Sequence, residues 1–252
     1  MDRRQALVLL PGLAAATLST DLRAALDVGG MLGAANDAAK AASLTDQQVR
    51  DYASQMAKYS DKQSSIAPPG SPYAQRLTVL TTGLTEDAGL KLNYKVYMVK
   101  QVNAFAMADG TIRLYSGLMD MMTDDEIRYV IGHEMGHVKA GHTKKRMQTA
   151  LATSATQKAV ASSGTKAGVL ADSQMGDLMV QVVRAQHSQS NEREADDYAL
   201  QFMSRRKYDR KACVSALEKL AKMSGGGDTN WLSTHPAPKE RAARLKAQID
   251  KA

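Results

Sequence analysis

Residues 133–137 are the part of this sequence whose residue types and spacing most directly indicate chemistry. They form the pattern H-E-x-x-H, with His133, Glu134 and His137. On a helix, histidines four residues apart lie on one face, where both imidazoles can bind one zinc ion, and the glutamate lies beside a water that the metal holds. The spacing therefore predicts a zinc site of the kind that hydrolyses peptide bonds.

The flanking residues predict the helix that such a site needs. Thr123 and Glu126 have the spacing of a capping box, and Gly141 marks the expected end of the helix. Glu134 falls on the apolar stripe of this helix, where a carboxylate without a partner is costly and a metal with its water supplies one. The apolar residues of the stripe are Ile127, Val130, Ile131, Met135 and Val138.

A catalytic zinc ion usually has three protein ligands, so a third must come from elsewhere in the chain. A metzincin has a third histidine six residues after the second. Here that position is Thr143, and His142 is one residue too early, which excludes the metzincin pattern. The remaining option is a carboxylate on a later helix. The glutamates that follow the motif are Glu192, Glu194, Glu218 and Glu240.

Helical phase separates the first two of these glutamates. Steps of three, seven and eleven residues from Glu192 reach an apolar stripe, Ala195, Ala199 and Met203. The same steps from Glu194 reach a polar face, Asp197, Gln201 and Arg205. Glu192 is therefore predicted to point inward and Glu194 outward. Asp196, one turn after Glu192, could accept a hydrogen bond from a ligand histidine. The alternative is an ordinary helix with charged edges.

The motif H-E-M-G-H followed by E-R-E-A-D at residues 192–196 resembles the HtpX/BepA family of gluzincin metallopeptidases. The segments 94–98, 102–108 and 114–119 are similar to its periplasmic YggG/LoiP-type members, and the resemblance covers roughly residues 43 to 245. It implies an α+β fold that is mostly helical: a zincin-like metallopeptidase domain with a small β-hairpin or sheet beside the motif helix.

The resemblance also implies the catalytic roles. His133, His137 and Glu192 would be the ligands of one zinc ion per chain, and Glu134 the general base. Zinc lowers the pKa of its bound water to roughly 7. Glu134 would take the proton of this water as it attacks the scissile carbonyl, and would then deliver that proton to the leaving amine. We therefore expect a zinc endopeptidase.

Further residues match a second group of family positions. Asp196 corresponds to the acidic residue four places after the ligand glutamate. Thr234-His235-Pro236 and Arg241 correspond to a late H-P…R element that lies near the active site. His235 would either stabilise the oxyanion or cap the zinc ion; the alternative is a residue that only precedes a helix.

The segment before the motif predicts a β-hairpin. Residues 93–99 and 103–108 have strand-like patterns, and Asp109-Gly110 is a turn signal before a return strand at 111–115. An edge strand here would bind an extended peptide through main-chain hydrogen bonds. A plain structural hairpin is the alternative, and both can hold. The resemblance implies that the strand lining the active site contains Asn103, Ala104, Phe105 and Ala106.

The remaining helices and loops are predicted from helix-capping residues and from the positions of glycine and proline. We expect helices at 45–62 and 72–84, one that carries Glu192 and ends near 206, one from 209 to near 224, and a last one from about 238. The glycines at 225–227 predict a flexible loop. Residues 143–170 fit either a helix or a mobile flap over the cleft.

Residues 1–16 have the architecture of a signal peptide. Arg3 and Arg4 precede an apolar run that is too short to cross a bilayer as a helix, and Ala14–Ala16 fits a cleavage site. Residues 17–43 are expected to be an Ala/Gly-rich linker, and 44–252 the metallopeptidase domain. An uncleaved anchor is the alternative, and Sec and Tat export both stay open. The expected location is the periplasm.

Composition restricts the partners. The single cysteine, Cys213, lies far from the cleavage site, so neither lipidation nor an intrachain disulfide is expected. The formal charge is +7, with basic clusters at 144–146 and 205–207 that are interpreted as solvated helix faces, although they would also favour anionic membrane surfaces. No nucleic-acid-binding module is recognisable. His142 and His187 are interpreted as structural or surface residues.

Together these features predict an endopeptidase that degrades misfolded or damaged envelope proteins, which is a protein quality-control function. The alternative is a proteolytically silent chaperone or assembly factor that retains the zinc fold. The intact Glu134 favours the endopeptidase, because a silent site would be free to change at this position.

Overall fold

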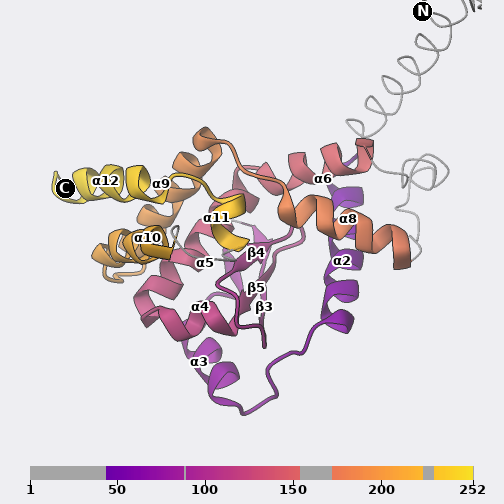
Figure 1. The fold of residues 1–252 in the computed structure, drawn as a ribbon, viewed down its shortest axis with the longest axis horizontal. Helices are drawn as coiled ribbons and strands as arrows, with labels where there is room; N and C mark the ends of the chain where they lie inside the picture. The colour runs from indigo at the N-terminus through magenta and orange to yellow at the C-terminus, as the bar shows by residue number, and fades with distance from the viewer. Residues whose placement is uncertain (1–43, 88, 154–171, 224–229, 252) are drawn as a thin grey trace, which may run out of the picture. The chain divides into compact units, whose positions relative to one another are not determined.

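The computed structural model describes residues 44–87, 89–153, 172–223 and 230–251. The expected signal peptide, the linker and the glycine loop at 225–227 lie outside these residues, as do residues 154–170 of the segment left open above. The helical content around a small sheet matches the predicted fold class (Figure 1).

A three-stranded sheet lies at the centre of the described domain. Its strands are β3 (Asn93–Tyr97), β4 (Ala104–Ala106) and β5 (Thr111–Tyr115), in the order β3-β5-β4. The predicted hairpin is confirmed, since β4 pairs antiparallel with β5, whereas β3 pairs parallel with β5. Strand β4 is therefore an edge of this sheet. A short ribbon of β1 (Glu86–Asp87) and β2 (Leu90–Lys91) precedes it.

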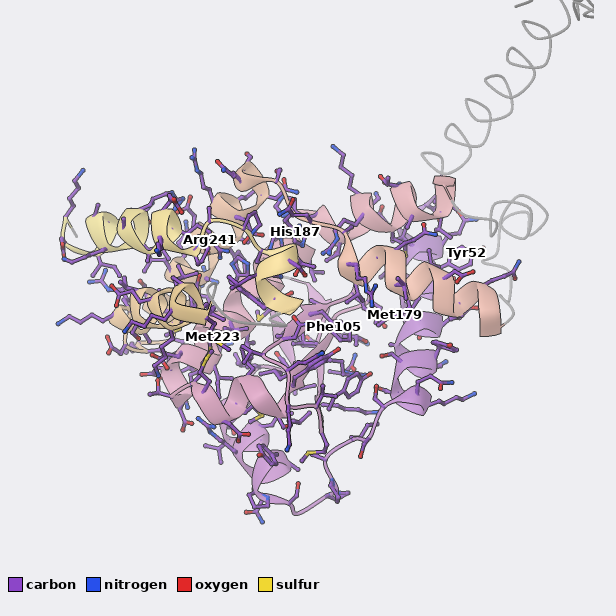
Figure 2. All side chains as sticks on the ribbon, viewed as in Figure 1. Tyr52, Phe105, Met179, His187, Met223 and Arg241 are labelled. Carbon is purple, nitrogen blue, oxygen red and sulfur yellow. The ribbon has the colours of Figure 1, made fainter. Side chains whose placement is uncertain are left out.

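The two faces of the sheet contribute to different cores, because side chains alternate along each strand. On one face, Val96 and Ala104 join the core with the helices α3 (Pro72–Leu80), α5 (Asp124–Lys139), α9 (Gln189–Arg205), α10 (Lys211–Met223) and α12 (Pro238–Ile249). On the other, Tyr97 and Phe105 join the core with α2 (Asp46–Gln63), α6 (His142–Thr153) and α8 (Asp172–Arg184). Figure 2 shows Tyr52 of α2 and Met179 of α8 on this second side.

The predicted caps place the helices. Thr123 closes a full capping box at the start of α5, and Thr45 does so for α2. The motif helix ends as predicted, with Gly141 at φ 75° just beyond its last turn. Helix α3 is shorter than expected and ends at Leu80, because the chain then turns through Gly83 at φ 71°, a conformation that a right-handed helix cannot continue.

An ion-pair network fastens α2 to the sheet. Arg113 of β5 is 2% exposed, and its Nε donates to Asp61 Oδ1 at 2.9 Å. Asp61 also accepts from the Tyr97 hydroxyl at 2.7 Å and from Lys95 Nζ at 2.7 Å. A buried guanidinium needs such a partner. Because Asp61 belongs to α2 and Arg113 to β5, this contact fixes α2, and with it the second core, against the sheet.

Two short helices, α4 (Ser116–Met121) and α11 (Asn230–Thr234), complete the described elements. Of the part of segment 143–170 that the structure describes, residues 143–153 are helical and belong to α6. None of the helices in the described ranges combines the length and the apolar character needed to cross a bilayer.

Candidate active site

Helices α5 and α9 approach each other closely at Gly136, and this contact brings the two motifs together. A Cβ atom at Gly136 would lie 2.9 Å from the Cα and from the carbonyl oxygen of Ala195. Only a residue without a side chain therefore permits this spacing. One residue further along α5 is His137, and three residues before Ala195 is Glu192, so the contact sets the distance between the two motifs.

The side chains of His133, His137 and Glu192 converge in a buried cluster. The Nε2 atoms of the two histidines are 3.1 Å apart, and Glu192 Oε1 lies 3.2 Å from His137 Nε2. Glu192 Oε2 lies 3.5 Å from His133 Nε2. Glu192 is 1% exposed, which confirms its predicted inward orientation, and the Glu194 side chain is 64% exposed. Two imidazole nitrogens and a carboxylate are a donor set that suits zinc.

His235 reaches the same cluster from the segment after α11. Its Nδ1 lies 3.1 Å from Glu192 Oε1 and 3.3 Å from His133 Nε2, and the ring stacks on Trp231 at 4.5 Å between centroids. The four residues His133, His137, Glu192 and His235 offer ligand atoms within 4.8 Å of one another. The position of Nδ1 favours the zinc-capping role over the oxyanion role in this conformation.

Glu134 lies beside the cluster without contributing to it. Its side chain is 4% exposed, and its Oε1 lies 3.5 Å from His235 Nε2. This buried oxygen has no hydrogen-bond partner among the described residues. A buried acceptor left in this way is costly and indicates room for a bound water or substrate group. The donor set and this oxygen together fit a hydrolytic zinc centre.

Asp196 and Arg241 lie behind the cluster and contact its residues His133 and Glu192. Asp196 Oδ1 lies 3.0 Å from His133 Nδ1, which confirms the predicted contact with a motif histidine, and it accepts from the Tyr129 hydroxyl at 2.8 Å. Arg241 binds the same carboxylate through Nε at 2.9 Å and Nη2 at 2.7 Å, and it also pairs with Glu192. Arg241 therefore pairs with two buried carboxylates. Figure 2 shows Arg241 on α12.

These contacts shift the pKa values of the buried groups. Burial acts to raise the pKa of Asp196, but the charge of Arg241 and the hydrogen bonds from His133 and Arg241 outweigh it and hold that pKa well below its usual range. Burial and Arg241 act to lower the pKa of His133, but Glu192 and Asp196 outweigh them and raise it to about 9. Asp196 is therefore a permanent acceptor for His133.

Of the two interpretations of His142 and His187, the structural one agrees with the structure and the surface one is wrong. Both are buried, and both contact His137. His142 Nδ1 lies 3.0 Å from His137 Nδ1, and the His187 ring stacks on the His137 ring with centroids 3.7 Å apart. Burial, together with His137, His235 and Arg146 nearby, holds the pKa of His187 far below its usual range, so this ring is neutral.

Arg146 also departs from its expected place in a solvated basic cluster. Its Nη1 donates to His187 Nε2, and its Nη2 donates to the carbonyl oxygens of Ala185 and Val183. The sequence carried no local signal for this, because His187 is brought here by a backbone hydrogen bond from its N–H to Thr234 O at 2.9 Å.

A narrow cavity joins the predicted substrate strand to Glu134. Its wall is formed by residues 103–108, which include Asn103, Ala104, Phe105 and Ala106, and it is completed by Glu134, His235 and residues of α6, α8 and α11. All three residues of β4 are buried. The strand edge therefore borders the site, and α8 and α11 cover it in this conformation.

The chain matches the model of "Peptidase family M48" over residues 74–249. The chain belongs to peptidase family M48. It is 45% identical to the metalloprotease LoiP of Escherichia coli (strain K12) over 96% of each chain, and 36% identical to the metalloprotease YcaL of the same strain over 89% of each chain. Among solved structures it is similar to S. mikatae Ste24p, with a TM-score of 0.42, 18% identity, and coverage of 72% of this chain and 51% of that chain.

Membership of family M48 confirms the predicted family. It also confirms the prediction that the chain is a zinc metallopeptidase, because zinc is the metal of this family. The residues that the sequence did not assign to the site are His142, His187, Arg146, Tyr129 and Trp231.

Proposed function

We propose that this chain is a zinc-dependent endopeptidase that hydrolyses misfolded or damaged proteins of the cell envelope. His133, His137 and Glu192 would hold one zinc ion per chain. The observation that carries the proposal is the convergence of these three side chains, within 3.5 Å of one another, beside the unpartnered Oε1 of Glu134. A bound zinc ion would supply an activated water and a Lewis acid for the scissile carbonyl.

Glu134 is the general base of the proposed reaction. Its free Oε1 accepts the proton of the attacking water, and the same oxygen returns that proton to the leaving amine. The neighbouring His235 Nε2, 3.5 Å from this oxygen, is placed to contact a group that binds there. Substrate entry requires His235 to leave the position it holds next to Glu192 and His133.

Asp196 and Arg241 act through other residues. Asp196 fixes the ring of His133 with Nδ1 towards its own carboxylate, so that Nε2, on the side of Glu192, would be the atom that binds zinc. Arg241 pairs with both Asp196 and Glu192, so that neither buried carboxylate lacks a cationic partner. Both are positioning residues in this proposal.

The edge of β4 is the proposed substrate site. Asn103 and Met107 share backbone hydrogen bonds with β5, which leaves the N–H and C=O of Ala104 and Ala106 directed away from that strand. An extended peptide that adds to this edge would be bound through its main chain with little dependence on sequence, as degradation of damaged proteins requires.

The envelope location rests on the signal-peptide pattern of residues 1–16. The test is cell fractionation of the full chain combined with the mass of the mature N-terminus. Export with removal of about the first 16 residues supports the proposal, whereas an intact chain in the cytoplasmic fraction contradicts it.

The activity is tested by casein digestion with purified protein of measured zinc content. We expect cleavage that a chelator stops and that added zinc restores. Stoichiometric zinc with no cleavage of any unfolded substrate would instead support the silent chaperone or assembly factor, for which a narrow cavity at β4 would be the resting form.

A further inference from the structure

His142 lies between the motif residue His137 and the surface residue Glu194. The proposed peptidase reaction gives it no role. It is the first residue of α6 and is 8% exposed. The left-handed turn at Gly141, with φ 75°, folds the chain back so that His142 faces the last turn of α5. One ring nitrogen, Nδ1, lies 3.0 Å from His137 Nδ1. The other, Nε2, lies 3.3 Å from Glu194 Oε2 on α9.

The proton positions in this series follow from what each atom can donate. The carboxylate oxygen of Glu194 accepts in this contact, so His142 Nε2 carries the proton that points to it. A neutral His142 then has a lone pair on Nδ1, which accepts from His137 Nδ1–H. His137 in turn keeps its lone pair on Nε2, the atom that lies 3.2 Å from Glu192 Oε1 and 3.1 Å from His133 Nε2.

We propose that His142 is the positioning residue for the ligand His137, and that Glu194 fixes the tautomer of His142 from the surface. This inference rests on the proposed zinc site and deepens it. Each motif histidine then has its own acceptor at Nδ1: His133 has Asp196, and His137 has His142.

The two acceptors, Asp196 and His142, differ in charge and in burial, and these differences determine how strongly each one affects zinc binding. Asp196 is fully buried and bears a charge, whereas His142 is neutral and passes its contact to a carboxylate whose side chain is 64% exposed. A hydrogen bond to an exposed carboxylate is screened by water. The contact from His142 to His137 therefore matters more than the contact from Glu194 to His142.

Zinc affinity, measured by competition with a chelator of known affinity, tests the first contact. His142→Phe keeps a ring of similar size and removes the acceptor, so we expect zinc to bind about 10- to 100-fold more weakly, the usual cost of losing such a contact. His142→Asn presents an oxygen where Nδ1 was and should stay within a few-fold of the wild type. Wild-type affinity in His142→Phe overturns the proposal, as does an equal loss in both variants.

Glu194→Ala tests the second contact, with Glu218→Ala on the exposed face of α10 as its matched control. We expect Glu194→Ala to weaken zinc binding by about 2- to 5-fold, as for an exposed ionic contact. The control should not change it. An effect equal to that of the control, or larger than that of His142→Phe, overturns the role given to Glu194.

A spectroscopic measurement reports on the contact between His137 and His142 directly, beginning with the wild-type chain. In protein with ¹⁵N-labelled histidine and bound zinc, the Nδ1–H of His137 should exchange slowly with water, and this protection should be lost in His142→Phe. Fast exchange in the wild type overturns the proposal. A wild type that binds no zinc at all is a separate outcome, because it contradicts the peptidase proposal itself.

Discussion

Asp196 of α9 lies under His133 of α5, with its Oδ1 3.0 Å from the imidazole Nδ1. The contact joins the two motifs that are separated by more than fifty residues of sequence. Asp196→Asn keeps an acceptor at this place but removes its charge. We expect zinc affinity to fall by about 10- to 100-fold. Chelator competition measures this effect.

The matched control for Asp196→Asn is the neighbouring Asp197→Asn. Asp197 pairs with Arg244, and its side chain is 42% exposed. The same chemical change there should leave zinc affinity unaltered. Equal losses in the two variants would show that charge on α9, rather than the contact with His133, supports the metal.

The close packing at Gly136 predicts a second effect. In Gly136→Ala the new Cβ would meet the backbone of Ala195, which cannot move aside without shifting α9. We expect unfolding in urea to show a loss of about 1–3 kcal/mol, as for overpacked cores, together with weaker zinc binding. Gly132→Ala is the comparison, because its Cβ would meet the side chain of Phe202 at 2.7 Å, whereas the nearest backbone atom, Cα of Ala199, is 3.4 Å away. A greater loss of zinc affinity in Gly132→Ala than in Gly136→Ala would contradict this explanation.

The ion pair between Asp61 and Arg113 predicts a pH-dependent stability. Burial acts to raise the pKa of Asp61, but hydrogen bonds from Arg113, Lys95 and Tyr97 outweigh it and lower this pKa below its ordinary value of 3.8. A depressed pKa means that the stabilisation is complete above the unfolded-state pKa. It is lost as the pH falls through the folded-state pKa.

Asp61→Asn should therefore lower the free energy of unfolding by about 1.5–3 kcal/mol at pH 7, with a difference that shrinks as the pH falls below 4. Denaturant unfolding of both proteins across pH 3–7 measures it. Asp51→Asn, on an exposed turn of the same helix, is the control. A difference that grows towards low pH would have the wrong sign.

The edge of β4 that faces away from β5 allows substrate binding to be tested separately from folding. Ala106→Pro removes an N–H that points away from β5, so the sheet should persist. We expect kcat/KM for an extended peptide to fall by about 10-fold, the equivalent of one lost main-chain hydrogen bond.

Two control variants separate this effect from others. Ala106→Ser keeps the N–H and should retain activity. Phe105→Pro removes an N–H on the β5 side and should unfold the domain. Full activity in Ala106→Pro would place the substrate elsewhere.

Local patterns in the sequence were sufficient to predict the elements that bear the motifs. Thr123 and Gly141 mark the start and the end of the motif helix, because capping and left-handed turns depend on residues close in sequence. Helical phase was enough to orient Glu192 and Glu194, since the two faces of one helix meet different surroundings.

Contacts between distant segments were not predictable in the same way. The parallel pairing of β3 with β5 depends on how the chain crosses the sheet, which the turn at residues 109–110 does not specify. His187 contacts His137 only because its backbone is bonded to Thr234. His142 was set aside because it missed the metzincin spacing, although a histidine directly after Gly141 must lie near the end of the motif helix.

In the proposed reaction Glu134 moves the proton and does not hold the metal. The most direct test is Glu134→Gln, with zinc content and casein cleavage measured on the same sample. We predict stoichiometric zinc and a rate of cleavage lowered by about 10²- to 10⁴-fold, the usual contribution of a general base. Cleavage at the wild-type rate by the zinc-loaded variant would contradict the role of Glu134.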